Sequence, residues 1–526
     1  MVDVSPVPDP LLGLPRLDGT HRAGESSGAA SRIDVQRPSS GTAAALQHLP
    51  EGEERERMLA LLVPSLHDVV LGAGWDFDDA SRSQAVDLSS PSLSGLASPD
   101  QRSSSPTAPP EVSSTAGAKE LADALLIRSC KQGWERAFEL HRDWVRPEPK
   151  AADEVLIRNV AVGLNPVDYK SVLYNFGIAD TPWVLGRDVA GVVHAVSPSA
   201  EGSSSSSSGG FKVGDRVWTC ADSRDSRAGA YQRFCIAKAH TIGRIPPNVT
   251  DEGAATIGTG LVTAAVIVYW FFRIQRAEEL GTDRLPRKVP EVEGLTDSAP
   301  RDRRWILIYG GGAITGIYAV QLARLSGLRP IVIASSQNFD YLTSIGAEVC
   351  LDRFSEPAAL LDDIRSKTEG QLAFAVDCVG SKTAAFCERA LKEANGDWSG
   401  VGQLCCLAGD PKVKPGEQPA TQDLEQRLVR DVKIHKISFS TTFYGDDLFS
   451  RTLLADLNAL FASGSLQPAK AEVLPDGLAS VRRGLESLRD GTAPRAKKLV
   501  VRIADTPDAS LTNLGVRAEL SWNGVP

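Results

Sequence analysis

The sequence predicts an α/β protein in which a small β-rich barrel precedes a doubly wound parallel sheet. Beyond residue 304, short apolar runs alternate with helical segments, which is typical of βαβ units with helices on both faces of a parallel sheet. Between residues 119 and 255, short strand-like runs are separated by Gly and Pro, as in a barrel or sandwich. Residues 1–118 are dominated by Pro, Ser, Gly and Asp, which predicts a disordered extension.

The β-rich part contains five expected strands, each an alternating or apolar run. They are Ala124–Ser129, Glu154–Val162, Asp188–Ala195, Gly214–Thr219 and Ala230–Ala237. The Ser-rich run 203–210 is expected to be a loop. The twenty residues Gly253–Phe272 carry no charge and predict a long helix. Their length fits a bilayer, but their Gly, Ala and Thr content favours a buried helix over a membrane anchor.

The α/β part contains strands and helices in alternation, after a charged segment, 273–304, that is expected to be a surface loop. The expected strands are Trp305–Tyr309, Pro330–Ala334, Ala373–Asp377 and Gly402–Ala408. The expected helices are Thr315–Ser326, Asn338–Ile345, Pro357–Lys367 and Thr383–Glu393.

A glycine-rich turn joins the first of these strands to its helix. Gly311, Ala313 and Gly316 occupy the three positions of a G-x-G-x-x-G pattern. Backbone N–H groups at such a helix N-terminus bind a pyrophosphate, so the turn predicts a dinucleotide site and a Rossmann-type sheet. About twenty residues later, where an NAD-binding protein places Asp or Glu, the chain has Ser335, Ser336 and Asn338, which favours NADPH.

Composition excludes other functions. The net charge of −9 and pI of about 5.5 argue against nucleic-acid binding. The eight cysteines show no C-x-x-C or zinc-finger spacing, so they are interpreted as core residues in a reducing compartment, and no metal is expected. The first twenty residues lack the apolar core of a secretory signal, and we expect a cytoplasmic protein without a membrane segment.

Several motifs together resemble the medium-chain dehydrogenase/reductase superfamily. They are GLNPVDYK (163–170), LGRDVAGVV (185–193), KVGDRVW (212–218), AATIGTGLVTA (254–264), the glycine turn, GAE (346–348), VDCVG (376–380) and RAKKLVVRI (495–503). The resemblance implies a GroES-like catalytic domain at 119–255 and an NADP-binding Rossmann domain at 256–445. It also implies a closing segment at 446–503 and a tail at 504–526.

The resemblance is to the zinc-free branch of that superfamily. Arg187 stands where zinc-containing members carry a ligand histidine, and the four-cysteine zinc lobe is absent from the sequence. Zinc-free members reduce activated C=C bonds or quinones. NPVDYK, GRDVAG and ASSQNFDYLTSIGAE are similar to stand-alone, trans-acting enoyl reductases of fungal polyketide pathways. This implies a small enone or enoyl substrate delivered by an acyl-carrier domain, and a monomer or homodimer.

The resemblance implies roles for individual residues. The catalytic candidates are Asn165, Lys170 and Tyr174, although Tyr169, Tyr174 or solvent could each supply the proton, and both tyrosines also fit as core aromatics. Asn165 also fits a turn, and Lys170 a solvated surface. The cofactor-binding candidates are Asn165, Thr263, Gly310, Gly311, Gly312, Ala313, Ile314, Thr315, Gly316, Ser335, Ser336, Asn338, Val379 and Gly380. Thr263 also fits a hydroxyl bonded to its own helix turn, and Val379–Gly380 a plain strand end.

The leading hypothesis from the sequence is a zinc-independent, NADPH-dependent reductase of C=C bonds or quinones. The alternative is a non-catalytic NADPH-binding sensor or interaction protein on the same fold.

Overall fold

The computed structural model describes residues 121–197, 210–274, 304–393, 400–412, 431–510 and 514. These residues all belong to one unit of the chain, Ser65–Pro526. The expected extension 1–118 lies outside the described residues. So do most residues of the Ser-rich loop, most residues of the segment 273–304 and the end of the tail.

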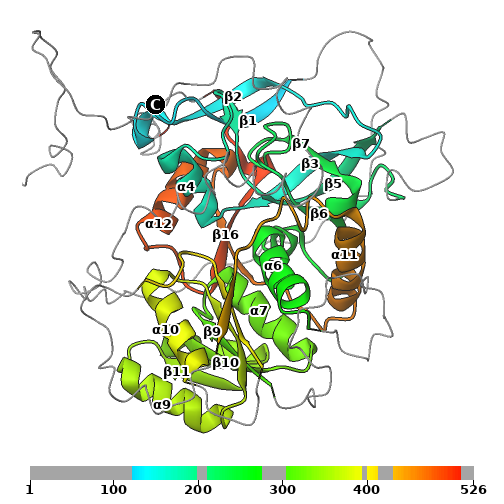
Figure 1. Ribbon diagram of the computed structural model, residues 1–526. Helices are drawn as coiled ribbons and strands as arrows, with labels where there is room; N and C mark the ends of the chain where they lie inside the picture. Colours follow the sequence, from blue (N-terminus) through cyan, green and yellow to red (C-terminus); the bar gives the residue numbers. More distant parts are fainter. Residues whose placement is uncertain are drawn as a thin grey trace, which may run out of the picture. The chain divides into compact units, whose positions relative to one another are not determined.

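A six-stranded parallel sheet forms the second half of the fold (Figure 1). Its strand order, β11-β10-β9-β12-β13-β14, is the order 3-2-1-4-5-6 of doubly wound nucleotide-binding sheets, so the predicted fold class is confirmed. The strands are β9 (Trp305–Tyr309), β10 (Arg329–Ala334), β11 (Val349–Asp352), β12 (Leu372–Asp377), β13 (Gly402–Cys406) and β14 (Val432–His435).

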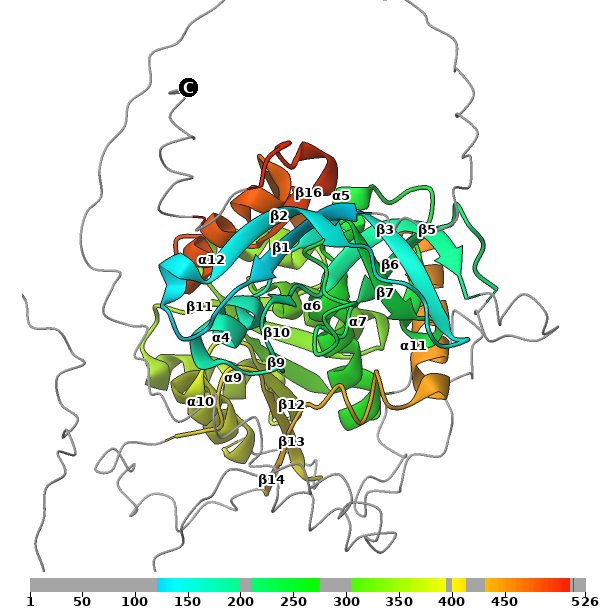
Figure 2. The ribbon, with the colours of Figure 1, turned by 90° about the horizontal axis from the view of Figure 1, so that it is seen from above.

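Helices cover both faces of this sheet because its strands are apolar on both sides. Along β9, Trp305 and Leu307 pack in one hydrophobic cluster with α9 and α10, whereas Ile306 and Ile308 pack in another with α6 and α7. Figure 2 shows these two pairs of helices on opposite sides of the strands. The helices are α6 (Gly258–Ala265), α7 (Ile314–Leu325), α8 (Phe339–Ser344), α9 (Pro357–Thr368), α10 (Ser381–Lys392) and α11 (Asp447–Ala462), with the short η8 (Ser336–Asn338) before α8.

The barrel half is built on a second, mostly antiparallel sheet in the order β15-β16-β3-β5-β6-β8, with β7 also paired to β3. A small sheet, β2-β1-β4, lies beside it through a bridge from Ala124 to Gln232. The strands are β1 (Leu121–Ile127), β2 (Phe138–Val145), β3 (Glu154–Gly163), β4 (Trp183–Val184), β5 (Asp188–Val196), β6 (Arg216–Cys220), β7 (Phe234–Lys238), β8 (Ile242–Arg244), β15 (Lys470–Leu474) and β16 (Lys497–Arg502). The helical segments are η2 (Trp134–Arg136), α4 (Pro166–Tyr174), η4 (Ala239–Thr241), α5 (Asp251–Ala254), η9 (Gly477–Ser480), α12 (Val481–Arg489) and η10 (Ile503–Asp505).

The C-terminal strand β16 belongs to this barrel sheet although it follows the whole parallel sheet in sequence. Val501 of β16 lies opposite Val162 of β3 in antiparallel register, and Leu164 N donates to the Leu499 carbonyl at 2.9 Å. This return places the side chains of residues 497–502 beside those of residues 161–165, so Lys498 can contact Asn165.

The single long helix predicted for Gly253–Phe272 is wrong. The run is divided into α5, α6 and the π-helix η5 (Val266–Phe271). Thr256 interrupts it because its hydroxyl donates to the Gly253 carbonyl at 2.7 Å, and Gly258 lets α6 begin in contact with Asp188 of the barrel. Within the described residues, no helix is long and apolar enough to cross a bilayer.

The expected strand Ala230–Ala237 begins late, at Phe234. The N–H groups of Ala230 and Tyr231 donate instead to the carbonyls of Gly186 and Leu185, at 3.0 and 2.9 Å. The sequence interpretation also missed β11 and helix α4. Asn165 caps that helix, so the Asn165-Pro166 pair starts a helix rather than a simple turn.

Candidate active site

The glycine turn connects β9 to α7 in a shape that requires glycine. Gly310 has φ of 86°, and a Cβ there would lie 2.7 Å from Cγ2 of Val379. A Cβ on Gly316 would collide with the Gly310 carbonyl oxygen. Gly310 therefore makes the tight turn, and Gly316 lets α7 pack closely against it.

The turn ends at an open helix N-terminus. Ala313 is the N-cap of α7 and offers no side-chain cap, and the first turn contains no acidic residue. The N–H groups of Ile314, Thr315 and Gly316 precede the first intrahelical bonds and point out of the helix. The predicted residues Gly310–Gly316 thus form one anion-compatible cradle, which fits the pyrophosphate of a dinucleotide.

The candidates for a 2′-phosphate lie at the end of the neighbouring strand. Ser335 and Ser336 directly follow β10. Asn338 lies close to the glycine turn: its Nδ2 is 3.1 Å from the position that a Cβ on Gly312 would take. Arg353 is at the same edge: its N–H donates to the Ala334 carbonyl at 3.0 Å, and its side chain is exposed.

The sequence interpretation missed Arg353 because it missed β11. In a parallel sheet the carboxyl ends of neighbouring strands meet at one edge, so the residue after β11 lies beside the residues after β10.

Val379 and Gly380 follow β12 and border the same turn. Cys378 N donates to the Tyr309 carbonyl at 3.0 Å, which joins the ends of β9 and β12. Asp377 holds the bend: its Oδ2 accepts N–H groups from Val379 at 3.3 Å and from Gly380 at 3.0 Å. Burial raises the pKa of Asp377 to about 7, although these hydrogen bonds oppose the rise.

On the barrel side, Asn165 lies at the N-terminus of α4 and is buried. Its N–H donates to Oδ2 of Asp168 at 2.9 Å, and its Oδ1 accepts from Nζ of Lys498 at 2.6 Å. Because an ammonium only donates, Lys498 determines the orientation of the amide and leaves Nδ2 facing away. Nδ2 is buried without a hydrogen-bond partner among the described residues, so it is a donor available to a bound ligand.

Lys498 belongs to a buried ion pair. Its Nζ lies 2.6 Å from Oδ2 of Asp188, and both side chains are almost inaccessible to solvent. The other oxygen of Asp188, Oδ1, accepts from both N and Oγ1 of Thr259, each at 2.6 Å. Thr259 precedes Gly260, where a Cβ would lie 2.7 Å from Cγ2 of Ile314. The network therefore connects Asn165 through α6 to the first residue of α7.

A second group of buried polar side chains lies beside Asn165. Tyr231 Oη donates to Oδ2 of Asp168 at 2.7 Å, whereas Oδ1 of Asp168 has no partner among the described residues. Burial raises the pKa of Asp168 to about 6, against the Tyr231 hydrogen bond and the positive charge of Arg187. Arg187, which was noted in the sequence only for replacing a histidine, thus faces this carboxyl.

The other predicted residues of the barrel side take different positions. Lys170 is half-buried with no ion pair among the described residues, and burial lowers its pKa. Thr263 Oγ1 donates to the Thr259 carbonyl at 2.7 Å. This is the bond to its own helix turn that the sequence also allows in place of a cofactor contact.

The two tyrosines take different positions on α4. Tyr169, four residues from Asn165, is buried in the barrel core, and burial raises its pKa. Tyr174 ends α4, nine residues from Asn165, which is about 13 Å along a helix. A catalytic role for Tyr174 stays a prediction.

The site does not fit a zinc ion. Arg187 carries no lone pair for a metal, and among the described residues no three His, Cys, Asp or Glu side chains are grouped to hold one.

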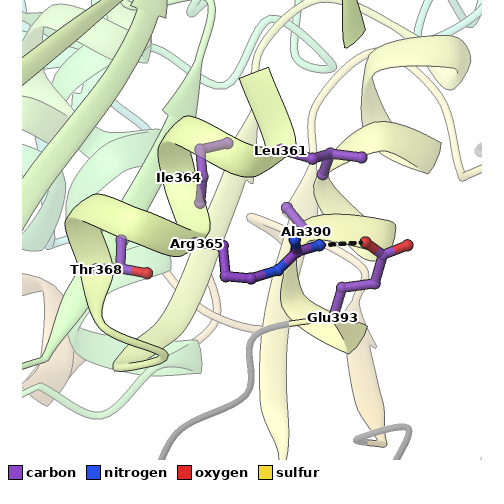
Figure 3. Close-up of a pocket in the computed structure, with 6 residues that line it drawn as sticks. All are labelled: Leu361, Ile364, Arg365, Thr368, Ala390 and Glu393. Carbon is purple, nitrogen blue, oxygen red and sulfur yellow. Dashed lines mark hydrogen bonds and ion pairs between the residues drawn. The ribbon is translucent and has the colours of Figure 1, made fainter. Parts of the chain in front are cut away.

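A separate hollow lies between α9 and α10 (Figure 3). Side chains of Leu361, Ile364 and Ala390 line it. Across it, Nη2 of Arg365 donates to Oε2 of Glu393 at 3.0 Å. None of the predicted site residues lines this hollow, and we assign it no function.

Comparisons with known proteins agree with this fold. The family model of the alcohol dehydrogenase GroES-like domain matches residues 151–268, and that of the zinc-binding dehydrogenases matches residues 315–416. Trans-enoyl reductase buaC of Petromyces alliaceus is 30% identical over 368 residues, covering 68% of this chain and 92% of that protein.

Solved structures share the fold. A mycobacterial protein complexed with NADPH superposes with a TM-score of 0.54 and 21% identity, covering 72% of this chain and 99% of its own. The CurK enoyl reductase gives a TM-score of 0.53 and 18% identity, covering 73% and 99%.

The chain therefore belongs to the medium-chain dehydrogenase/reductase superfamily, with fungal trans-enoyl reductases among its relatives. It is an oxidoreductase of the enoyl reductase and quinone oxidoreductase type, and it uses a nicotinamide cofactor and a small-molecule substrate.

The buried pair leads to a stability prediction. Lys498→Met should lower the free energy of unfolding by about 3–5 kcal/mol, because Asp188 keeps a buried charge without its counter-ion. The double variant Asp188→Asn, Lys498→Met should recover most of that loss, since no charge remains. Urea unfolding of the three proteins measures both effects, and a double variant no more stable than Lys498→Met would contradict this explanation.

The buried carboxyl of Asp377 predicts a pH effect. Its pKa is about 7 in the folded chain against 3.8 in the unfolded one, so the unfolded state releases its proton first as pH rises. The folded state should therefore lose stability between about pH 4 and 7. Asp377→Asn lacks this loss and should gain roughly 2–4 kcal/mol on the wild type between pH 4 and 8. Urea unfolding curves of both proteins at pH 4 and pH 8 test this. The same change in the free energy of unfolding with pH in both proteins would refute it.

Proposed function

We propose that the chain is a zinc-independent, NADPH-dependent reductase of C=C bonds conjugated to a carbonyl group, in enoyl thioesters or enones. The observation that supports this most directly is a chain of contacts between the two halves. Hydrogen bonds and an ion pair connect Asn165 through Lys498 and Asp188 to Thr259, and the next residue, Gly260, packs against Ile314 of the glycine turn. These contacts join a free amide donor in the barrel to a nucleotide cradle in the parallel sheet.

The residues of the turn fit the cofactor. Gly310–Gly316 would hold the pyrophosphate, Ser335, Ser336, Asn338 and Arg353 the 2′-phosphate, and Val379 and Gly380 the nicotinamide ribose. Thr263 and Asn165 would border the nicotinamide. When bound, NADPH supplies a hydride from its nicotinamide ring.

The chain's own task in this reaction is to position the substrate and stabilise charge. Negative charge develops on the substrate carbonyl oxygen as the β-carbon is reduced, and hydrogen-bond donors aimed at that oxygen lower the barrier. Asn165 Nδ2 and the Lys170 ammonium are such donors. The α-carbon then needs a proton, for which Tyr174 and solvent remain the candidates.

The donor set supports zinc independence, because Arg187 and Asn165 are hydrogen-bond donors rather than metal ligands. The relationship to trans-enoyl reductases supports a substrate delivered by an acyl-carrier domain to a monomer or homodimer. A cytoplasmic location is part of the same proposal.

Turnover distinguishes this function from its alternative. The full chain should oxidise NADPH in the presence of short 2-enoyl thioesters, with slower turnover of quinones, measured by the absorbance of the reduced nicotinamide. Binding of NADPH without oxidation by any enoyl thioester, enone or quinone would instead support a non-catalytic NADPH-binding protein. Dialysis against a zinc chelator should leave the rate unchanged, and loss of activity on chelation would overturn zinc independence.

Arg353 provides a test of cofactor choice. Arg353→Ala should weaken NADPH binding about 10–100-fold, because a charge-assisted hydrogen bond to a phosphate is lost. NADH binding should change little. Fluorescence titration with both cofactors measures this, with Arg136→Ala, an exposed arginine of η2, as the matched control. Equal losses for NADPH and NADH would show that Arg353 does not contact the 2′-phosphate.

A further inference from the structure

Arg187 is a half-buried cation whose side chain is not paired with any described residue. Its backbone is fixed, since Ala221 N donates to its carbonyl at 2.7 Å and the preceding Gly186 packs against the ring of Tyr231. Its Nε is shielded from solvent and makes no hydrogen bond. A buried N–H without an acceptor lowers stability, so a ligand that accepts a hydrogen bond from Arg187 would be bound favourably.

Four titratable side chains from four segments interact electrostatically with this charge. They are Asp168 of α4, Cys220 of β6, Tyr231 before β7 and Tyr444 before α11. Burial raises the pKa of each, and the positive charge of Arg187 opposes every one of these rises. The charge of Arg187 therefore acts on all four side chains.

The group does not provide a full counter-ion. Tyr231 already donates to Asp168, and Tyr444 Oη donates to the carbonyls of Cys220 and Ala221 at 3.2 and 3.1 Å. Asp168 is the one carboxyl of this group, with a pKa that burial raises to about 6, and the carboxylate of Asp188 is paired with Lys498. Lys170, on the same helix as Asp168, adds a second cation with no ion pair among the described residues. This side of the site therefore has an excess of positive charge beside Asp168.

We propose that Arg187 binds the carbonyl oxygen of the substrate and stabilises the negative charge that this oxygen acquires. The inference rests on the proposed function for the identity of the ligand, an acyl oxygen conjugated to a C=C bond. A guanidinium suits this task because it stays charged and offers several N–H donors in one plane.

The electron balance defines what Arg187 would stabilise. A hydride from NADPH forms the new C–H bond at the β-carbon, and NADPH becomes NADP⁺. The C=C pair moves to the bond between the α-carbon and the carbonyl carbon, and the carbonyl pair moves onto oxygen, giving an enolate. A proton from Tyr174 or solvent then bonds to the α-carbon and the carbonyl is restored. The charge on oxygen exists only between these steps, which is where a fixed cation lowers the barrier.

A carboxylate of the same length as the acyl group imitates the enolate and tests the site without turnover. Hexanoate should bind to the full chain saturated with NADP⁺, as measured by isothermal titration calorimetry. Arg187→Met should weaken that binding at least tenfold, and Arg187→Lys should retain part of it. The control is Arg224→Met: Arg224 also lies near Tyr444 but is paired with Asp222, and its loss should change nothing. Equal hexanoate affinity in Arg187→Met and wild type, or no binding to wild type, would overturn the proposal.

Two further readouts separate this role from a structural one. Arg187→Met should leave the urea midpoint unchanged or higher, because an unpaired cation is removed, and NADPH affinity should stay within twofold. With an enoyl thioester, kcat should fall about 100-fold or more, as for loss of an oxyanion donor. A lower urea midpoint would assign Arg187 to folding. If wild type reduces no enoyl substrate, the proposed function fails, whereas the hexanoate titration still decides whether Arg187 binds an oxyanion.

Discussion

The buried carboxylate of Asp188 is the group on which both halves of the site depend. It begins β5, accepts two hydrogen bonds from Thr259 of α6 and pairs with Lys498 of β16. A buried charge must have all of these partners, because losing one leaves an uncompensated ion in a low dielectric. The same carboxylate therefore fixes the relative positions of barrel strands and of the helix that packs on the glycine turn.

The two halves contribute different chemistry to the site. The parallel sheet brings backbone groups, since the carboxyl ends of β9, β10, β11 and β12 meet at one edge and place the glycine turn, Ser335, Arg353 and Val379 together. The barrel brings side chains that carry charge or donate hydrogen bonds: Asn165, Lys170 and Arg187. A nucleotide needs the former, and a substrate whose oxygen becomes negative needs the latter.

Polar groups without hydrogen-bond partners lie at the barrel side of the site. Nδ2 of Asn165, Oδ1 of Asp168 and Nε of Arg187 are all buried without hydrogen bonds among the described residues. Each lowers the stability of the folded chain, and surrounding contacts such as the Tyr231–Asp168 and Lys498–Asn165 bonds hold them in place. The two donors among them, Nδ2 of Asn165 and Nε of Arg187, need no rearrangement when charge develops on a substrate.

The sequence by itself determined the fold class, four of the six strands of the parallel sheet with the helices α7 to α10 that pack on it, and the residues of the glycine turn. These features follow from local patterns: the spacing of apolar residues, and glycines where the backbone turns or packs closely. Only the tertiary structure decided that Lys498 orients Asn165, 333 residues away, that Arg353 joins Ser335, and that Nε of Arg187 is buried without a hydrogen bond among the described residues. It also divided the apolar run Gly253–Phe272, because Gly258 and Thr259 of α6 contact Asp188. Such contacts depend on which strands become neighbours in the folded chain, and the spacing of residues along the sequence does not determine these neighbours.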